Sequence, residues 1–413
     1  MTTTAVPGTA TSHERRITAA LFAAGLTTFA SMYSAQALLP SLSNAFGATP
    51  ARAALAVSLT TGFLALAIVP VSALSSRVGR TRVMIGSAVT SAVIGLLLPF
   101  SPTLDVLLAG RALQGVALAG VPAVAMAYLA EEIGSEGLGA AMGVYVAGTS
   151  IGGLAGRLIP AFTLDLASWR WAEAAVSVGA AACTIWFVRG LPPSRGFIAR
   201  PAGIRIVLGD LGAPLRHPGL LTLFGLAFVL MGGFVSLYNY LGYRLTRPPF
   251  ELPATVAGSV FLLYLAGTAA AAVTGLLADR LGRRRVLTAS VATMGLGLAI
   301  SIPDHLIAVV VGVLLCTAGF FGAHTVASAW VGAMAPENRG AASSLYLFSY
   351  YLGSAIIGGV AGLAYARTGW IGLAGFVATL IAVAAVLLCT LARQSHRTSG
   401  HDTVTAPDQL AVP

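Results

Sequence analysis

Long apolar stretches, separated by short segments rich in Gly, Pro and Arg, recur along the whole chain. A helix that crosses a bilayer needs about 20 apolar residues, and these stretches have that length. The pattern predicts twelve membrane spans, at residues 17–39, 53–74, 83–100, 106–129, 138–164, 171–188, 220–241, 255–278, 286–302, 306–334, 341–365 and 371–391. We therefore expect an all-α membrane protein built from these transmembrane helices.

Composition supports a membrane protein and excludes a water-soluble domain. Of the 413 residues, 57% are hydrophobic and 9% are charged, whereas soluble domains carry about 25% charged residues. The mean hydropathy is +0.85. Because too few polar side chains are available to cover a surface that faces water, lipid must replace water around much of the chain.

The formal net charge is +10, and all 24 of the Lys and Arg residues are arginines. They lie in short runs between apolar stretches, so the charge indicates membrane orientation and no nucleic-acid partner. Most arginines lie in alternate loops, at 15–16, 77–82, 189–216, 280–285, 339 and 393–397, and few lie in the others, at 52, 170, 244, 247 and 367. Since basic loops stay inside, we expect a multi-pass protein of a bacterial inner membrane with both termini in the cytoplasm.

Three motifs recur at nearly the same spacing, which indicates an internal duplication. Phe29-x-Ser31-x-Tyr33 returns as Phe234-x-Ser236-x-Tyr238, Arg77-x-Gly79-Arg80 as Arg280-x-Gly282-Arg283, and Gly152-Gly153-x-x-Gly156 as Gly358-Gly359-x-x-Gly362, at offsets of 205, 203 and 206 residues. We expect two pseudo-symmetric six-helix bundles, 17–188 and 219–392, a cytoplasmic linker, 189–218, and cytoplasmic tails, 1–16 and 393–413. Parallel repeats of this kind are typical of transporters whose substrate site lies between the halves at mid-membrane.

The loop Gly275-Leu-Leu-Ala-Asp279-Arg280-Leu-Gly282-Arg283-Arg284-Arg285 resembles the signature loop of the major facilitator superfamily, G-x-x-x-D-R-x-G-R-R/K. Its first-half counterpart keeps Arg77, Gly79 and Arg80 but has Ser76 in place of the Asp. Arg111-Ala-Leu-Gln-Gly115 resembles the R-x-x-x-G motif of the superfamily. The segments Gly152-Gly153-Leu-Ala-Gly156-Arg157, Ser168-Trp169-Arg170-Trp171-Ala172, Tyr238-Asn239-Tyr240-Leu241 and Pro249-Phe250 are similar to its YnfM-like, or acriflavine-sensitivity, branch, which is grouped with bacterial efflux carriers.

The resemblance implies a monomeric secondary carrier that uses the proton gradient and exports a small solute by alternating access. An uptake symporter or facilitator for a sugar or organic acid is the alternative. It further implies that Asp279 meets the start of the fifth helix near Gly139 when the carrier opens outward. The equivalent contact of the first-half loop, which has Ser76 in place of the Asp, is expected to be weaker. The implied gating residues are Arg77, Gly79, Arg80, Gly275, Asp279, Arg280, Gly282 and Arg283. The sequence has no nucleotide motif or metal cluster, so no cofactor is expected.

Four strongly ionisable side chains lie within the predicted spans: Arg111, Arg157, Glu173 and His324. Charges inside a bilayer are costly and indicate function. Arg157 and Glu173 both lie within about 12 Å of the outer interface, so they are placed to pair; Arg157 then either forms a static ion pair or faces the cavity and attracts an anion. Arg111, Glu173 and His324 are candidates for proton coupling, with structural hydrogen bonding as the alternative role.

Neutral polar residues complete the predicted substrate site. Tyr33 and Gln36 in the first span, and Tyr238 and Asn239 in the seventh, occupy comparable positions in the two halves, and Tyr350 is a weaker candidate for the same wall. Hydrogen bonding between helices is their alternative role. Because no Asp or Glu lies at mid-membrane to balance a cation, we expect a neutral or anionic solute, such as a drug, sugar or aromatic metabolite.

One motif suggests an enzyme instead. Gly148-Thr-Ser150-Ile-Gly152 fits the nucleophile pattern G-x-S-x-G, and His324 is the available base, which would give an intramembrane serine hydrolase. That pattern requires a turn between a strand and a helix, whereas Ser150 falls inside a predicted membrane helix. We therefore expect a transporter and not an enzyme.

Overall fold

The computed structural model describes residues 12–133, 135–194, 209 and 211–401. The first half contains α1 (Ser12–Tyr33), α2 (Leu39–Phe46), α3 (Pro50–Val78), α4 (Arg80–Leu97), η1 (Leu98–Phe100), α5 (Leu104–Leu118), α6 (Gly120–Glu132), α7 (Ser135–Leu164) and α8 (Trp169–Gly190). The second half contains α10 (Gly212–Arg216), α11 (Pro218–Thr246), α12 (Ala254–Ser259), η2 (Val260–Leu262), α13 (Leu263–Leu281), α14 (Arg283–Ile300), α15 (Leu306–Met334) and α16 (Arg339–His401). Within these residues the secondary structure is entirely helical.

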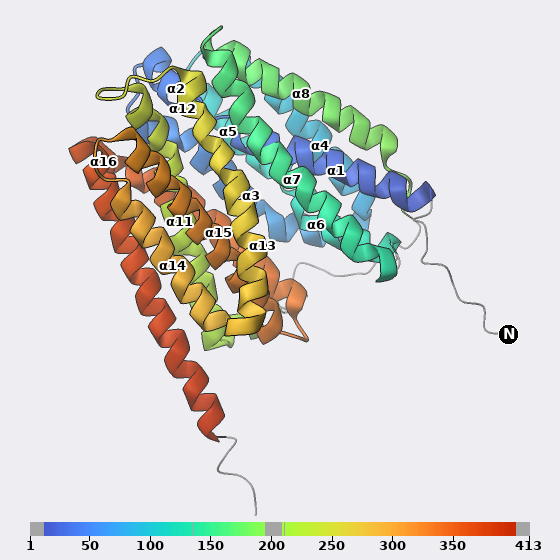
Figure 1. Ribbon diagram of the computed structural model, residues 1–413. Coiled ribbons are helices and arrows are strands. Elements are labelled where there is room, and N and C mark those ends of the chain that lie inside the picture. Colours follow the sequence, from blue (N-terminus) through green and yellow to red (C-terminus); the bar gives the residue numbers. More distant parts are fainter. Residues whose placement is uncertain (1–11, 134, 195–208, 210, 402–413) are drawn as a thin grey trace, which may run out of the picture.

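These helices supply twelve membrane-length segments. Nine helical stretches are long and apolar enough to span a membrane within the described part of the chain. The stretch 339–393 has 55 residues, about 80 Å of helix, and it breaks at Thr368 and Gly369, where the backbone leaves the helical region, so it forms two crossings. The remaining two segments are α1 and α14, which lie alongside the other helices (Figure 1).

Three predicted spans differ in detail from the structure. The first span ends at Tyr33, and a turn over residues 34–38 separates it from α2, so Gln36 lies outside a regular helix. The fourth span is divided into α5 and α6 at Ala119, and the eighth into α12, η2 and α13. Half of the linker predicted at 189–218, residues 195–208 and 210, lies outside the described residues.

Glycines bring helices into close contact in both halves. Gly152 and Gly156 of the duplicated motif lie against α1, whereas in the second copy Gly358 lies against α11 and Gly359 and Gly362 meet α3 of the first half. Two glycines outside the motif, Gly148 and Gly353, pack in the same way on α1 and α11. A Cβ atom at Gly148 would come within 2.5 Å of the Phe22 carbonyl oxygen, and one at Gly353 would collide with the carbonyl oxygen of Phe228. Only a residue without a side chain permits these close helix contacts.

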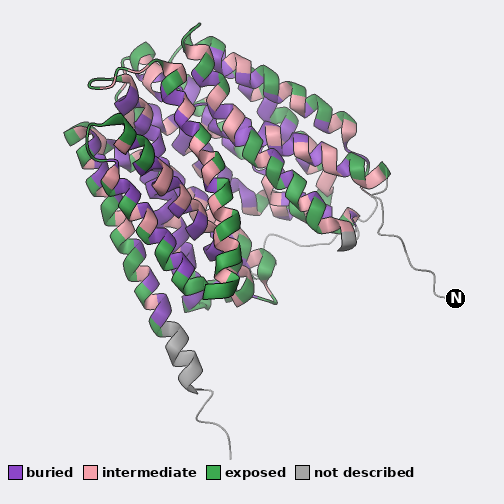
Figure 2. Cartoon of the chain, in the orientation of Figure 1, coloured by how far each residue is buried: buried purple, intermediate pink, exposed green. Residues whose placement is uncertain are grey.

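The outer surface of the helices is apolar, as a lipid environment requires. Buried residues gather on the inner faces of the bundle, and exposed residues follow the outward faces (Figure 2). Large exposed hydrophobic side chains include Leu265, Leu276, Leu113 and Ile371. The interior is the place where polar side chains are found, because lipid offers them no hydrogen bonds.

The two halves meet on one side of the bundle, which we call the far side, where α2 and α12 lie (Figure 1). They separate toward the opposite side, which carries the start of α1 and is called the terminal side. On the far side the Ser43 hydroxyl is 2.6 Å from that of Tyr243, and Tyr243 donates to the Leu39 carbonyl at 2.8 Å. These hydrogen bonds join the halves and close the far side.

Asp165, just beyond α7, makes a further contact between the halves. Its two carboxylate oxygens accept hydrogen bonds from the backbone N–H groups of Ala254 and Thr255, each at 2.8 Å, at the start of α12. Hydrogen bonds from the side chain and backbone of Thr255 hold the pKa of this exposed carboxyl below its ordinary value. The ionised carboxylate therefore favours far-side closure.

We predict that Asp165→Asn weakens far-side closure at neutral pH. The measurement is the distance between spin labels at Asn44→Cys on α2 and Val256→Cys on α12. Since the pKa is lowered in the closed state, the stabilisation is present above the ordinary carboxyl pKa of 3.8 and is lost as the pH falls through the lowered value. Asp105→Asn is the control, because Asp105 pairs with Arg52 inside the first half at 2.7 Å; equal distances in all three proteins would contradict the prediction.

Candidate substrate site

A cavity of about 170 Å³ lies between the two halves. The first half contributes residues of α1 and α7, and the second half contributes residues of α11, α13, α15 and α16. Aromatic side chains form most of its wall: Phe29, Tyr33, Phe234, Tyr264, Phe320, Phe321 and Tyr350. The only arginine and the only histidine in the described lining are Arg157 and His324, from opposite halves.

Arg157 provides the positive charge of the cavity and is only 3% exposed. Its Nε donates to Gln36 Oε1 at 2.6 Å, and its Nη1 donates to the Gly153 carbonyl at 2.7 Å. The guanidinium carbon lies 3.8 Å from the ring centroid of Tyr33 and 4.5 Å from that of Tyr264. These neutral partners hold the guanidinium without cancelling its charge.

No carboxylate lies within 4.0 Å of the Arg157 guanidinium among the residues that the structure describes. The predicted pair with Glu173 is therefore wrong. Glu173 Oε1 instead lies 3.9 Å from Nη1 of Arg111 and accepts a hydrogen bond from Ser34 at 3.0 Å. Arg157 and Glu173 are both near the far side, but their side chains leave their helices in different directions and contact different residues.

Arg111 and Glu173 form a second polar centre, buried within the first half. Arg111 is 1% exposed and Glu173 is 3% exposed. Arg111 donates to carbonyl oxygens of three residues, at 3.1 Å to Ala56, 2.9 Å to Ser31 and 2.9 Å to Met32. It therefore fixes the end of α1 onto α3 and α5. Both predicted roles of Arg111 remain open, because these bonds are structural and the nearby carboxylate is ionisable.

Gln36 and Asn239 meet across the two halves. Gln36 Nε2 donates to Asn239 Oδ1 at 2.8 Å, while its Oε1 accepts from Arg157. The sequence placed both amides in the substrate site; the structure places them at the far-side edge of the cavity, with Gln36 bonded directly to the cavity arginine. Tyr238 lies beside them, and its hydroxyl is 2.8 Å from that of Thr317.

His324 and Tyr350 lie together in the wall formed by the second half. The His324 ring is 4.7 Å from the Tyr350 ring and 6.1 Å from the Phe320 ring, measured between centroids. Its Nδ1 is 3.0 Å from the Tyr346 hydroxyl. Phe320 in turn stacks on Phe234 at 4.0 Å. Sequence reasoning missed this stacked wall; the adjacent pair Phe320-Phe321 within a small-residue stretch was the available signal.

The first-half signature loop makes contacts on the terminal side. Gly79 adopts φ 112° and Gly282 φ 87°, which favour glycine at these two helix junctions. Arg80 Nη2 lies 2.9 Å from Glu131 Oε1 and Arg80 Nη1 donates to Ser75 at 2.7 Å. The sequence did not predict this ion pair. Arg77 is exposed to solvent.

Within the described part of the chain, the second-half loop has no such contact. Asp279, Arg280 and Arg283 are exposed, as is Gly139, and the helix of Gly275 lies along α15. The predicted contact of Asp279 with the start of α7 was assigned to the outward-open state. In this structure the far side is closed, so the structure does not test the contact between Asp279 and α7, which stays a prediction.

The hydrolase motif lacks the geometry of an active site. Ser150 lies in the interior of the continuous helix α7 and borders the cavity as an exposed residue. His324 Nδ1 is directed to Tyr346 and not to Ser150. A turn between a strand and a helix, which the nucleophile pattern requires, does not occur at this position.

Membrane-length helices in two packed halves, with an aromatic and cationic cavity between them, define a membrane carrier. Comparison with known proteins agrees: the chain belongs to the Major Facilitator Superfamily, whose model matches residues 21–258 and 249–409. The fold and family expected from the sequence are thereby confirmed. The protein is a multi-pass membrane transporter and not an enzyme.

Individual relatives match over almost the whole chain. It is 41% identical to the inner membrane transport protein YnfM of Escherichia coli (strain K12), over 92% of this chain and 91% of that protein. It is 38% identical to the MFS-type transporter YybF of Bacillus subtilis (strain 168), over 92% and 94%. Among solved structures, a bacterial homologue of the lysosomal transporter Spinster, inward-facing and occupied, superposes with a TM-score of 0.75 at 13% identity, covering 93% of this chain and 98% of that one.

We predict that Glu173→Gln lowers the free energy of unfolding by about 2 kcal/mol, because it leaves the buried Arg111 without its carboxylate. Asp105→Asn removes an exposed pair, with side chains 54% and 72% exposed, and should change stability by less than about 0.5 kcal/mol. Melting of the purified proteins in detergent measures both. Equal losses in the two variants would show that the buried pair has no special role.

Proposed function

We propose that the protein exports a small organic anion with a flat, apolar body in exchange for protons, across a bacterial inner membrane with both termini in the cytoplasm. The observation that carries this proposal is Arg157, a buried guanidinium in the cavity with neutral partners only. Isolated charge in a low-dielectric site is costly, and an anionic solute supplies the missing countercharge. Of the neutral and anionic solutes expected from the sequence, this favours the anionic ones.

The cavity wall supports an aromatic or otherwise planar body for the solute. The Phe234 ring stacks on that of Phe320 at 4.0 Å and meets the Tyr264 ring edge-on at 5.5 Å, measured between centroids. Aromatic side chains favour flat ligands through stacking, whereas a sugar requires many more polar groups than these rings provide. A carboxylate on Arg157 with its ring among these side chains satisfies both parts of the site.

Proton coupling is assigned to Glu173, with Arg111 as its partner. Ser34, which bonds Glu173, and Gln36, which bonds Arg157, belong to the same short turn after α1. A change of charge at Glu173 therefore acts on the turn that also holds the substrate arginine. His324 lines the cavity and is a second candidate proton carrier.

Alternating access follows from movement of the two halves, 17–188 and 219–392, about the cavity. In this structure the far side is closed and the halves separate toward the terminal side (Figure 1). The opposite state would separate α2 from α11 and bring Asp279 to the start of α7. One chain supplies both walls of the cavity, which supports a monomer as the working unit.

The export direction rests on the similarity to the YnfM-like branch, because one closed state is common to exporters and importers. Everted vesicles, whose interior corresponds to the cell exterior, should accumulate the anion when the pH gradient is imposed. Proton-driven uptake into right-side-out vesicles would instead establish the symporter, and the proposal of export would be abandoned.

We predict that Arg157→Gln weakens anion binding by at least about tenfold, because a charge-assisted hydrogen bond is lost. Thermal-shift titration of purified protein with small carboxylates, benzoate included, measures the affinity, and benzamide serves as the neutral analogue of benzoate. Arg157→Lys should restore little, since it keeps the charge but loses the planar fork.

The matched control is Arg170→Gln, an exposed far-side arginine that bonds the carbonyls of Pro99 and Ser101 outside the cavity. It should bind carboxylates as the unaltered protein does. Tighter binding of benzamide than of benzoate, or unchanged benzoate affinity in Arg157→Gln, would contradict an anion site at Arg157.

We predict that Glu173→Gln abolishes proton movement driven by the solute while anion binding persists and still depends on Arg157, because Glu173 lies outside the cavity lining. Proteoliposomes with an entrapped pH-sensitive dye report the proton movement, and Asp105→Asn is the control. Solute-driven proton movement that persists in Glu173→Gln but is lost in His324→Gln would transfer the coupling role to His324.

A further inference from the structure

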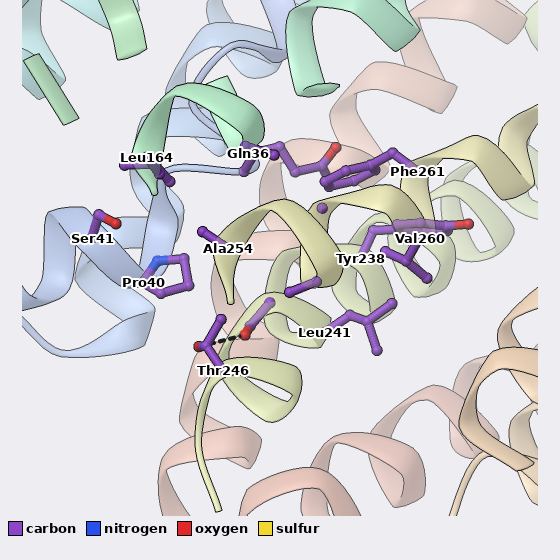
Figure 3. Close-up of a pocket in the computed structure, with 15 residues that line it drawn as sticks. Gln36, Pro40, Ser41, Leu164, Tyr238, Leu241, Thr246, Ala254, Val260 and Phe261 are labelled. Carbon is purple, nitrogen blue, oxygen red and sulfur yellow. Dashed lines mark hydrogen bonds between the residues drawn. The ribbon is translucent and has the colours of Figure 1, made fainter. Parts of the chain in front are cut away.

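Gln36 separates two cavities that lie in line from the terminal side to the far side. The first is the aromatic cavity with Arg157 in its wall. The second is a smaller pocket of about 40 Å³, shown in Figure 3, whose lining includes Gln36 itself. Pro40 and Ser41 belong to its first-half side, and Leu241 and Thr246 to its second-half side. A solute that leaves the aromatic cavity toward the far side must therefore pass Gln36.

The Gln36 amide is bonded on both sides of this boundary. Its oxygen accepts from Arg157 Nε at 2.6 Å, and its nitrogen donates to Asn239 Oδ1 at 2.8 Å. Gln36 is 2% exposed and Asn239 is 1% exposed. Because Asn239 belongs to the other half, this hydrogen bond is part of far-side closure.

Arg157 is only partly satisfied by the protein. A guanidinium has five N–H donors in a planar fork, and here one hydrogen bond goes to Gln36 and one to Gly153. A carboxylate that binds the side of the fork in a bidentate manner uses Nε and Nη2. It then competes with Gln36 for Nε.

We infer that Gln36 is a substrate-responsive gate residue between the two cavities: an anion on Arg157 displaces the Gln36 amide, which breaks its bond to Asn239 and opens the way into the pocket of Figure 3. The inference rests on the proposed anion site at Arg157. The pocket of Figure 3 is then the next place that the solute occupies on its way to the far side. In the empty carrier Gln36 positions the Arg157 guanidinium. When the solute binds, the Gln36 amide moves away from Arg157.

Unpaired groups beside the bridge make its opening less costly. Asn239 Nδ2 and Ser58 Oγ are buried without a hydrogen-bond partner in the described structure. Both face the glycine pair of α16, at 3.5 Å and 3.7 Å from the Cβ position that a side chain at Gly358 would have. A closed state that leaves these two groups unsatisfied is stabilised less than one with complete pairing, so one competing ligand suffices to open it.

The test measures entry of water-soluble reagents into the smaller pocket. In the full-length protein Cys183, Cys316 and Cys389 are replaced by serine, and Ser41→Cys is introduced in the pocket lining. A membrane-impermeant thiol reagent is applied from the terminal side of the reconstituted carrier, so that it must pass Gln36 to reach the thiol introduced at position 41. Labelling rates are compared with no addition, with benzoate and with benzamide.

Three variants separate the gate from the binding site. Gln36→Met removes both hydrogen bonds at similar volume and should raise the labelling rate about tenfold, with or without benzoate. Gln36→Glu places a carboxylate on Arg157, so it should weaken benzoate binding at least about tenfold. Asn338→Leu removes an amide on the terminal side and should leave the labelling of the unaltered carrier unchanged.

With Gln36 intact, benzoate should raise labelling and benzamide should not. Unchanged labelling in Gln36→Met, while benzoate still binds in an Arg157-dependent manner, would overturn the gate and leave the proposed function standing. Faster labelling in Gln36→Met, with no effect of Arg157→Gln on benzoate binding, would instead support a gate at Gln36 and overturn the anion site that operates it.

Discussion

An arginine that remains charged inside a membrane protein must find acceptors for its donors, and the centre of this carrier is organised by that requirement. Arg111 meets it within the protein, through backbone carbonyls and the nearby Glu173. Arg157 meets it only in part, through Gln36, the Gly153 carbonyl and aromatic faces. The first guanidinium therefore fixes helices, whereas the second keeps donors that the protein does not use.

The short turn after α1 connects these two guanidinium sites. Since the helix ends at Tyr33, consecutive side chains leave the regular helical spacing and reach different neighbours. Tyr33 lies under Arg157, Ser34 bonds both Arg111 and Glu173, and Gln36 bonds Arg157. A displacement of this turn moves Arg157 and the buried ion pair together, and the proposed coupling of solute to protons relies on this connection.

Much of the fold was predictable because the length of the apolar runs and the spacing of the repeated motifs can be read directly from the order of residues. The candidate site was predictable in part. Of the predicted substrate-site residues, Tyr33, Arg157 and Tyr350 line the cavity, as does the proton-coupling candidate His324, whereas Gln36, Tyr238 and Asn239 do not belong to its lining. The pairing of Glu173 was not predictable, because position along a helix fixes depth in the membrane but not direction around the axis. The end of α1 at Tyr33 was not predictable either, because the apolar run continues beyond it and gives no signal of where the helix ends.

Duplication preserved the packing of the two halves and let their chemistry diverge. With the offset of 206 residues that relates the glycine motifs, Arg157 corresponds to Leu363, which is 60% exposed on the outer surface. Glu173 corresponds in the same way to the exposed Thr379. A charge at either position would face lipid, where it is costly. The first half therefore carries the cavity arginine, whereas the second half supplies most of the aromatic side chains, so the proposed anionic solute with an apolar body would contact both halves at once.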